Sequence, residues 1–442
     1  ICILYGLRRT GKTFLIRQAI STLPIGETAY IKIRSSDTMA MLNRDLLQLS
    51  QNGKRYLFID EITLMSDFID SASLLSDIYA SSGMKIVLSG TDSLGFALSL
   101  DDELYDRAVM IHTTFIPFRE YARLLGIEDV DEYIRYGGTF RVGELDFEDE
   151  DLLDEGSSFQ DDETTRRYID TSIARNIQHS LSGYRSGGHF RHLIDLYEAG
   201  ELTNVINRLI EDMNHQFMIS VLDRLDEKEI IEKLKKILDI LDRGEMSVNI
   251  TEDHIREIRQ YLLLLDLIVD APSETIDSSR RIERILFSQP GMQYCQAQAL
   301  VYSLMKNDEF LRVSAKKRKA ITDLILEEVK GRMLEEIILL ETIKALPRGK
   351  RAFKLLFPTG EYDMVIHDEN AITCEIYEIK HSSQRDPGQV RYLTDPEKCD
   401  AAAYQYGDIT KRVVLYNGPD TVENNVHYQN IAEYLKGLRS VY

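Results

Sequence analysis

The first 126 residues alternate short apolar runs with stretches of helical periodicity. The apolar runs fall at residues 1–5, 28–33, 56–59, 85–88 and 109–111. Continuous runs of this length are typical of parallel strands that are buried on both faces, and helices usually connect such strands. We therefore expect residues 1–126 to form a parallel α/β sheet with helices on both of its faces.

Long amphipathic helices with few strand signals follow, from residue 165 to about 264. Thr251 is expected to cap the last of them, and two short apolar runs come next, at 267–269 and 281–286, with a turn-rich segment between them. Helices followed by a two-stranded ribbon predict a winged-helix unit, a module often used on DNA. Because the surroundings are acidic, we favour a structural or interdomain role for this unit over DNA contact.

The chain from about residue 311 starts helical and then becomes α/β. Two strand patterns, at 360–366 and 374–380, flank a polar turn and predict a hairpin. The whole chain is therefore expected to be a multidomain α/β protein. Its length agrees, because 442 residues exceed what one hydrophobic core usually supports.

The composition is that of a globular protein, with 43% hydrophobic and 29% charged residues. No apolar stretch reaches the length needed to cross a bilayer, and no signal-peptide pattern is present. The four cysteines are scattered without C-x-x-C spacing, so we expect a reduced, cytoplasmic protein. Because the chain begins inside a strand and without an initiator Met, we also expect residues before Ile1 to be missing.

The net charge of −20 is unevenly distributed. Residues 311–442 contain 20 Lys and Arg against 20 Asp and Glu, so the deficit lies in the first 310 residues. Between 144 and 163 there are eleven acids and no Lys or Arg, which is typical of a solvated insertion; a partner-binding segment is the alternative. The balanced C-terminal third is the part of the chain that could approach a phosphate backbone.

Residues 6–13, with the sequence GLRRTGKT, match the phosphate-binding loop G-x-x-x-x-G-K-[ST] at every required position. The glycines let backbone N–H groups converge on phosphate oxygens, while the lysine reaches the β and γ phosphates and the threonine ligates Mg²⁺. An apolar run precedes the loop and a helical pattern follows it, as a nucleoside triphosphate site requires. The residues that we expect to contact the nucleotide are Gly6, Arg8, Arg9, Thr10, Gly11, Lys12 and Thr13.

Four apolar residues at 56–59 lead into two carboxylates, Asp60 and Glu61. A buried strand of this kind delivers Asp60 to the Mg²⁺ shell, and Glu61 can polarise the water that attacks the γ-phosphate. The second acid favours hydrolysis over phosphoryl transfer to another substrate, and it disfavours a small-molecule kinase.

Polar residues after the next strand, Ser89 and Thr91, are candidates for sensing the γ-phosphate, although an ordinary turn is nearly as good an interpretation of either one. Arg107 and Arg119 flank the last strand. Either could stabilise transferred charge in its own or a neighbouring subunit, or could be a surface or interdomain ion-pair partner.

In the C-terminal hairpin, Glu378 and Lys380 share one strand face because side chains alternate with period two. Asp363 faces the same side if the turn at Glu369 and Asn370 has two or four loop residues. Asp363 and Glu378 would then bind one or two Mg²⁺, and Lys380 would orient the nucleophile or neutralise developing charge.

Several segments together resemble the archaeal-type ATPases of the AAA+/STAND assemblage. They are residues 6–13, 60–61, 88–91, 106–107, 117–121 and 133–138. The resemblance implies ATP as the nucleotide and favours Arg107 over Arg119 as the sensing arginine. One departure is that Thr139 and Phe140 stand where these relatives commonly continue with a proline.

Residues 331–382 resemble the restriction-endonuclease-like, PD-(D/E)xK module found at the C-terminus of many of these ATPases. That resemblance adds Glu335, on a preceding helix, to Asp363, Glu378 and Lys380 as site residues. The expected domains are a P-loop ATPase core at 1–126, a helical and winged-helix-like domain at 127–310, and a nuclease-like domain at 311–442.

These features predict an ATPase that uses ATP and Mg²⁺ and whose nucleotide cycle controls a metal-dependent, nuclease-like domain. The alternative is an ATP-driven switch or scaffold in which that domain binds a partner without cleaving it. A nucleic acid or a protein partner and a homo-oligomer are all compatible with the sequence, and no membrane is expected.

Overall fold

The computed structural model describes residues 1–101, 104, 106–139, 159, 161–183, 190–223, 232, 250–277, 281–282 and 284–439. The acidic segment at 144–163 lies outside the described residues apart from Phe159 and 161–163. No helix in the described ranges has the length and apolar character needed to cross a membrane.

The N-terminal domain is a five-stranded sheet in which every neighbouring pair of strands is parallel. The strand order is β2-β3-β4-β1-β5. The strands are β1 (Cys2–Gly6), β2 (Thr28–Lys32), β3 (Tyr56–Asp60), β4 (Lys85–Gly90) and β5 (Val109–Thr113). The helices of this domain are α1 (Lys12–Ser21), α2 (Met39–Gln51) and α3 (Ser93–Asp101). The parallel α/β sheet expected from the apolar runs is therefore confirmed.

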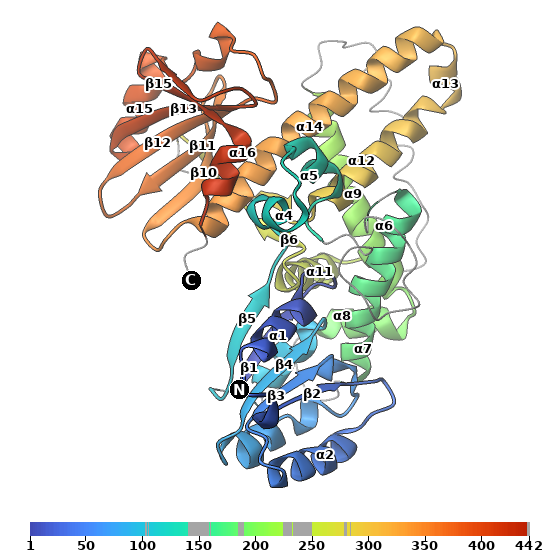
Figure 1. Ribbon diagram of the computed structural model, residues 1–442. Coiled ribbons are helices and arrows are strands. Elements are labelled where there is room, and N and C mark those ends of the chain that lie inside the picture. The colour runs from blue at the N-terminus through green and yellow to red at the C-terminus, as the bar shows by residue number, and fades with distance from the viewer. Residues whose placement is uncertain are drawn as a thin grey trace.

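Helices dominate the middle of the chain and pack on both neighbouring domains (Figure 1). They are α4 (Phe118–Leu125), α5 (Val130–Tyr136), α6 (Asp162–Tyr168), α7 (Arg175–Gly183), α8 (Arg191–Glu198), α9 (Leu202–Leu222), α11 (Glu252–Leu264), α12 (Pro290–Met305) and α13 (Asp308–Leu311). A π-helical segment, Ile169–Ala174, joins α6 to α7. Side chains of α7, α8, α9 and α11 share one hydrophobic core with the N-terminal sheet. The hydroxyl of Thr251 caps α11, as expected.

A β-ribbon follows α11 and reaches the C-terminal domain. Its inner half pairs β6 (Ile268–Asp270) with β9 (Ile285–Phe287), and its outer half pairs β7 (Ser273–Thr275) with β8 (Arg281–Ile282). The outer half continues the C-terminal sheet, because β7 lies parallel to β10 (Lys350–Leu356). This contact agrees with an interdomain role for the ribbon. Most of the segment between α9 and α11 lies outside the described residues, so the winged-helix unit stays a prediction.

The C-terminal domain is a mixed sheet with strand order β14-β15-β13-β12-β11-β10-β7-β8. Strands β10, β11 and β12 are antiparallel neighbours, and β13 then runs parallel to β12. The long helix α14 and the short helix α16 cover one face of the sheet, and α15 covers the other. The remaining elements are β11 (Glu361–Asp368), β12 (Thr373–Ile379), β13 (Asp408–Tyr416), β14 (Thr421–Glu423), β15 (Val426–Asn430), α14 (Ala315–Ala345), α15 (Pro396–Tyr406) and α16 (Ile431–Gly437).

The segment that directly follows the last strand of the N-terminal sheet docks on the C-terminal domain. Helix α4 contacts α16, and α5 contacts α14 and α12 (Figure 1). The buried carboxylate of Glu341 on α14 accepts a hydrogen bond from the backbone N–H of Phe118 at 2.8 Å. The N-terminal and C-terminal domains are thus joined through α4 and α5.

Candidate functional site

The loop between β1 and α1 has a backbone that only glycine permits at its first position. Gly6 has a φ of 142°, and a Cβ atom there would overlap the carbonyl oxygen of Thr113 on β5. The hydroxyl of Thr10 donates to the carbonyl oxygen of Leu7 at 2.8 Å and lies 2.8 Å from the hydroxyl of Thr113. These contacts hold the loop against the neighbouring strand.

Lys12 is buried at the start of α1 and is bonded to the loop itself. Its ammonium donates to the carbonyl oxygens of Gly6 at 3.0 Å and Leu7 at 2.7 Å. Burial lowers the pKa of Lys12 to about 8, although Glu61 and Asp60 oppose the shift. Both partners are neutral, so phosphate oxygens could replace them without breaking an ion pair.

Asp60 is the last residue of β3, and hydroxyl groups from three other elements donate hydrogen bonds to it. Its carboxylate accepts hydrogen bonds from Thr13 at 3.1 Å, from Tyr30 at 2.9 Å and from Ser89. The Thr13 hydroxyl and the Asp60 carboxylate are thus adjacent oxygen ligands of the kind that Mg²⁺ prefers. They fit the metal of a nucleotide site.

Glu61 follows in a left-handed backbone conformation, with a φ of 58°. Burial raises the pKa of its carboxyl group, while Lys12 and a hydrogen bond from the backbone of Thr91 act in the opposite direction. A carboxyl group with a raised pKa beside a phosphate loop is suited to accept a proton from water. Ser89 meets the site through its hydroxyl, whereas Thr91 meets it through its backbone.

Arg107 and Arg119 both contact groups outside this loop in their own chain. Arg107 precedes β5, which is parallel to β1, whereas the phosphate loop follows β1. Arg107 therefore lies at the other end of these strands, roughly 15 Å or one strand length from the loop. Its guanidinium pairs with Asp77 at 2.8 Å. Arg119 pairs with Glu120 at 3.0 Å and donates to the carbonyl oxygen of Leu438. Arg107 therefore cannot contact the nucleotide of its own subunit in this arrangement, and Arg119 is engaged in contacts with Glu120 and Leu438.

Sequence reasoning missed three contributors to the nucleotide site. Tyr30 on β2 bonds Asp60, as described above. The hydroxyl of Tyr168 on α6 donates to the carbonyl oxygen of Arg8 at 3.0 Å, and Asn176 on α7 donates to that of Thr91 at 3.2 Å. The parallel neighbour strands could have indicated Tyr30, but no local signal pointed to Tyr168 or Asn176.

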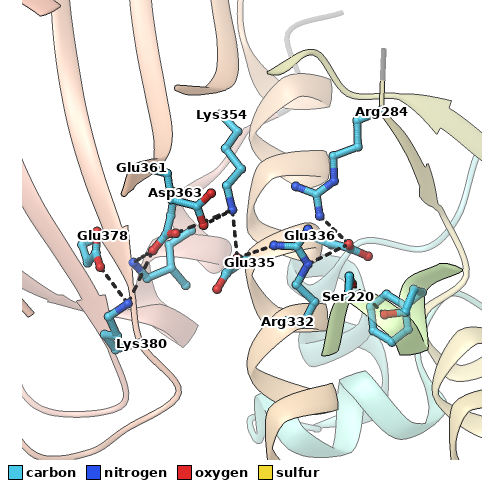
Figure 2. A network of polar contacts seen from close by, with 12 residues as sticks. Ser220, Arg284, Arg332, Glu335, Glu336, Lys354, Glu361, Asp363, Glu378 and Lys380 are labelled. Atoms are coloured by element: carbon cyan, nitrogen blue, oxygen red, sulfur yellow. Dashed lines mark hydrogen bonds and ion pairs between the residues drawn. The ribbon is translucent and has the colours of Figure 1, made fainter. Parts of the chain in front are cut away.

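The four positions expected for the second site do come together, as Figure 2 shows. The loop between β11 and β12 has the four residues 369–372. The ammonium of Lys380 lies 2.7 Å from an oxygen of Glu378 and 3.8 Å from one of Asp363. Glu335 approaches from α14 and contributes to the electrostatic environment of Asp363.

Irregular strand pairing turns Asp363 toward this cluster. The register between β10 and β11 shifts between Phe353 and Leu355, beside Asp363. The carboxylate of Asp363 accepts the backbone N–H of Ile379 at 2.8 Å, at the point where the pairing with β12 has ended. Bulges that redirect a side chain in this way are common next to active sites.

The second site is buried and its charges are strongly coupled. Burial raises the pKa of Asp363 to about 8, and Glu335 and Glu378 add to the shift. Burial also raises the pKa of Glu378. Burial alone would lower the pKa of Lys380, but Asp363 and Glu378 outweigh it and raise this pKa. The lysine therefore stays charged among the acids.

Two further residues, Lys354 and Glu361, belong to the same cluster and were missed from the sequence. The ammonium of Lys354 lies 2.5 Å from Glu361, 3.4 Å from Glu335 and 3.9 Å from Asp363. A lysine flanked by apolar residues in a strand, as in the run AFKLL, was a signal for a buried charge. The only sequence signal for Glu361 was its position two residues before Asp363.

The donor set of this cluster suits a hard divalent cation. One oxygen atom each from Glu335, Glu361 and Asp363 all lie within 4.8 Å of one another. Carboxylate oxygens are the ligands that Mg²⁺ and Mn²⁺ prefer. The residues present therefore fit such a metal.

Comparison with known proteins assigns the first part of the chain. Residues 1–122 match the family model described as an AAA domain. No curated protein matches the chain. The match covers the phosphate loop, Asp60 and the five-stranded parallel sheet, so this part of the chain is similar to AAA domains and has a P-loop α/β fold.

Two solved structures share a weak likeness with the chain. The Aeropyrum pernix Orc1 protein in complex with DNA is 17% identical, with a TM-score of 0.23, and the match covers 70% of this chain and 87% of that one. The Thermotoga maritima RuvB Holliday junction branch migration motor is 17% identical, with a TM-score of 0.21, and the match covers 64% and 84%. Scores this low establish no shared arrangement of domains, and nothing is carried over from either protein.

Proposed function

We propose that this protein hydrolyses ATP in its N-terminal domain and that its nucleotide cycle controls a metal-dependent site in the C-terminal domain that cleaves nucleic acid. The observation that carries the proposal is the convergence of the buried acids Glu335, Asp363 and Glu378 with Lys380 in one cluster. The same chain has an AAA-type phosphate loop at its other end.

In the hydrolytic step, Lys12 exchanges its two carbonyl partners for the β and γ phosphates of ATP. Thr13 and Asp60 would hold Mg²⁺, and Ser89 orients Asp60 through the hydrogen bond from its hydroxyl. Glu61 accepts a proton from the attacking water, which its raised pKa favours.

In the cleavage step, Asp363 and Glu378 would hold the metal, with Glu335 beside them. Bound Mg²⁺ would supply Lewis-acid stabilisation of charge on a phosphodiester. Lys380, which keeps its proton, orients the water and neutralises developing negative charge. DNA and RNA are both suitable substrate classes for this chemistry.

Arg107 is proposed to act on the nucleotide of a neighbouring subunit. Arg107 lies at the end of the strands opposite the phosphate loop. This position supports contact with the nucleotide of another subunit and argues against contact with the nucleotide of its own. Such a role requires a head-to-tail assembly of identical chains.

Control of the second site by the first is supported by the latch of α5, which we define as Asp131, Lys330 and His381. The Asp131 carboxylate lies 2.5 Å from a ring nitrogen of His381 and 3.1 Å from the ammonium of Lys330. Helix α5 follows the ATP domain in the chain, and His381 is the residue after Lys380. A movement of α5 would therefore act next to the lysine of the cleavage site.

The cleavage proposal is tested with the intact chain, Mg²⁺ or Mn²⁺, and DNA and RNA substrates. We expect metal-dependent cleavage that Asp363→Ala and Lys380→Ala abolish. The matched controls Glu423→Ala and Lys411→Ala remove exposed charges of the same domain and should leave cleavage unchanged.

The second candidate is an ATP-driven switch whose C-terminal domain binds a partner without cleaving it. The acids of the cluster are already paired with Lys354 and Lys380, which is also what a non-cleaving site would look like. Absence of metal-dependent cleavage in every nucleotide state would reject the first candidate and leave this one.

A further inference from the structure

We propose that the ammonium of Lys354 holds a cation position within the C-terminal cluster, and that a divalent cation binds there by displacing it, with Glu361 as an additional ligand. The inference rests on metal use by the proposed cleavage site. It adds two residues to that site and makes one of them a competitor of the metal.

The ammonium of Lys354 lies among the three carboxylates that could share a metal. Its nitrogen is 2.5 Å from Glu361, 3.4 Å from Glu335 and 3.9 Å from Asp363 (Figure 2). One oxygen from each of these residues lies within 4.8 Å of the other two. A single cation, an ammonium or a metal ion, therefore serves all three acids at once.

The charges of the cluster leave room for a divalent cation. Four acidic side chains, those of Glu335, Glu361, Asp363 and Glu378, face the two ammonium groups of Lys354 and Lys380. Arg332 also reaches Glu335 at 3.2 Å, but it is shared with Glu336. Buried carboxylates in excess over cations are costly, so a divalent ion would relieve their repulsion.

A second, independent observation is a ligand atom without a partner. Oε2 of Glu378 is buried and has no hydrogen-bond partner among the described residues, while Oε1 contacts Lys380. Buried polar atoms are nearly always paired in proteins, so this oxygen is available to a cation that binds in the cluster. Cations are the natural ligands of such an atom.

The cluster is also accessible from two sides. The side chains of Glu361 and Lys380 are 31% and 36% exposed, whereas those of Asp363 and Lys354 are each 4% exposed. A hydrated ion can therefore first meet Glu361 and then exchange with the ammonium of Lys354. The four-carbon stem of the lysine allows its head group to withdraw without moving the backbone.

The test measures Mn²⁺ binding to the intact, nucleotide-free chain by calorimetry and by the Mn²⁺-induced shift in Tm. Lys354→Met removes the competing ammonium and keeps an unbranched side chain of similar size. We expect Mn²⁺ to bind this variant about ten-fold or more tightly than the wild type, a change equivalent to about 1.4 kcal/mol. Adding Glu361→Gln to it should reverse most of the gain.

The matched control is Lys350→Met, which removes an exposed lysine from the same strand, β10. Binding at Thr13 and Asp60 is common to all variants and cancels in the comparison. Unchanged or weaker Mn²⁺ binding by Lys354→Met would overturn the inference. If Lys354→Met is poorly folded, Mn²⁺ should raise its Tm more than that of the wild type, and failure to do so would also overturn it.

These readouts do not depend on cleavage. Tighter Mn²⁺ binding by Lys354→Met without any cleavage would reject the proposed function and keep the cation position. Cleavage that Asp363→Ala abolishes, together with unaltered Mn²⁺ binding by Lys354→Met, would reject the cation position and keep the proposed function.

Discussion

The two candidate sites hold their charged groups in different ways. In the nucleotide site, Lys12 is bonded to backbone carbonyls and Asp60 to hydroxyl groups, so each charge has neutral partners. In the C-terminal cluster, carboxylates and ammonium groups pair with one another, as Lys354 does with Glu361. The first site is arranged to receive a ligand, whereas the second is neutralised by its own residues.

The difference has an energetic consequence. Replacing a carbonyl partner of Lys12 by a phosphate oxygen exchanges one charge-assisted hydrogen bond for another, and the new partner carries the opposite charge. Removing one partner from a buried ion pair costs about 3–5 kcal/mol unless another charge takes its place. Nucleotide binding should therefore need little rearrangement, while metal binding at the cluster must displace an ion pair. The contrast agrees with the proposed control of the C-terminal site by the ATP site.

The largest effect is expected from Glu61→Gln. The amide cannot accept a proton from water, so ATP turnover should fall by about 10²–10⁴ while ATP affinity stays close to that of the wild type. Phosphate release and equilibrium binding of ATP measure the two quantities separately. Glu27→Gln, at a partly exposed acid away from the loop, is the control. Equal turnover in Glu61→Gln and wild type would refute the assignment of the base.

Lys12→Ala should weaken ATP binding by about 100-fold, because charged hydrogen bonds to two phosphates are lost. Fluorescence titration with a labelled nucleotide measures the loss. Lys85→Ala removes an exposed lysine at the start of β4, at the end of the strands opposite the phosphate loop. This variant should bind ATP normally. If the two variants bound ATP equally well, the nucleotide site as described would be wrong.

A smaller effect is expected from breaking the latch of α5 with Asp131→Asn. A hydrogen bond from His381 lowers the pKa of Asp131 to about 2, and the same bond raises the pKa of His381. The stabilisation is therefore present where Asp131 is ionised and His381 is protonated. It is lost as the pH rises through the raised pKa of His381, or falls toward that of Asp131.

We expect Asp131→Asn to lower the free energy of unfolding by about 1 kcal/mol near pH 6, because the pair is partly exposed and screened by solvent. The difference from wild type should shrink near pH 9, where the histidine is neutral. Thermal or denaturant unfolding at the two pH values measures it, with Glu128→Gln at an exposed neighbouring acid as the control. A difference that does not depend on pH would show that the pairing of Asp131 with His381 does not contribute, and would contradict this prediction.

The N-terminal fold was largely predictable, because continuous apolar runs such as 56–59 are typical of parallel strands that are buried on both faces. The position of Arg107 could also have been derived. Arg107 precedes β5 and the phosphate loop follows β1, so in a parallel sheet the two lie at opposite ends of the strands. The approach of Asp363 to Glu378 could be predicted only if the loop between their strands had a particular length, and the sequence did not establish that length.

The rest depends on contacts that no local pattern contains. Lys354 meets Glu335 because α14 packs on the face of β10 that carries this lysine. The ribbon joins the C-terminal sheet because β7 finds a free edge of β10. Tyr168 reaches the phosphate loop across 160 residues of chain. Such pairings are fixed by the packing of whole elements.

The central claim is that the nucleotide state of the ATP site governs the C-terminal site. Its most direct test is the rate of Mn²⁺-dependent nucleic-acid cleavage by the intact chain without nucleotide, with ADP, and with ATP held by Glu61→Gln. We expect rates that differ by about ten-fold or more between the ATP-held state and the other two, a change of about 1.4 kcal/mol. Lys12→Ala should show no such difference. Cleavage at the same rate in every nucleotide state would contradict the account and make the two sites independent.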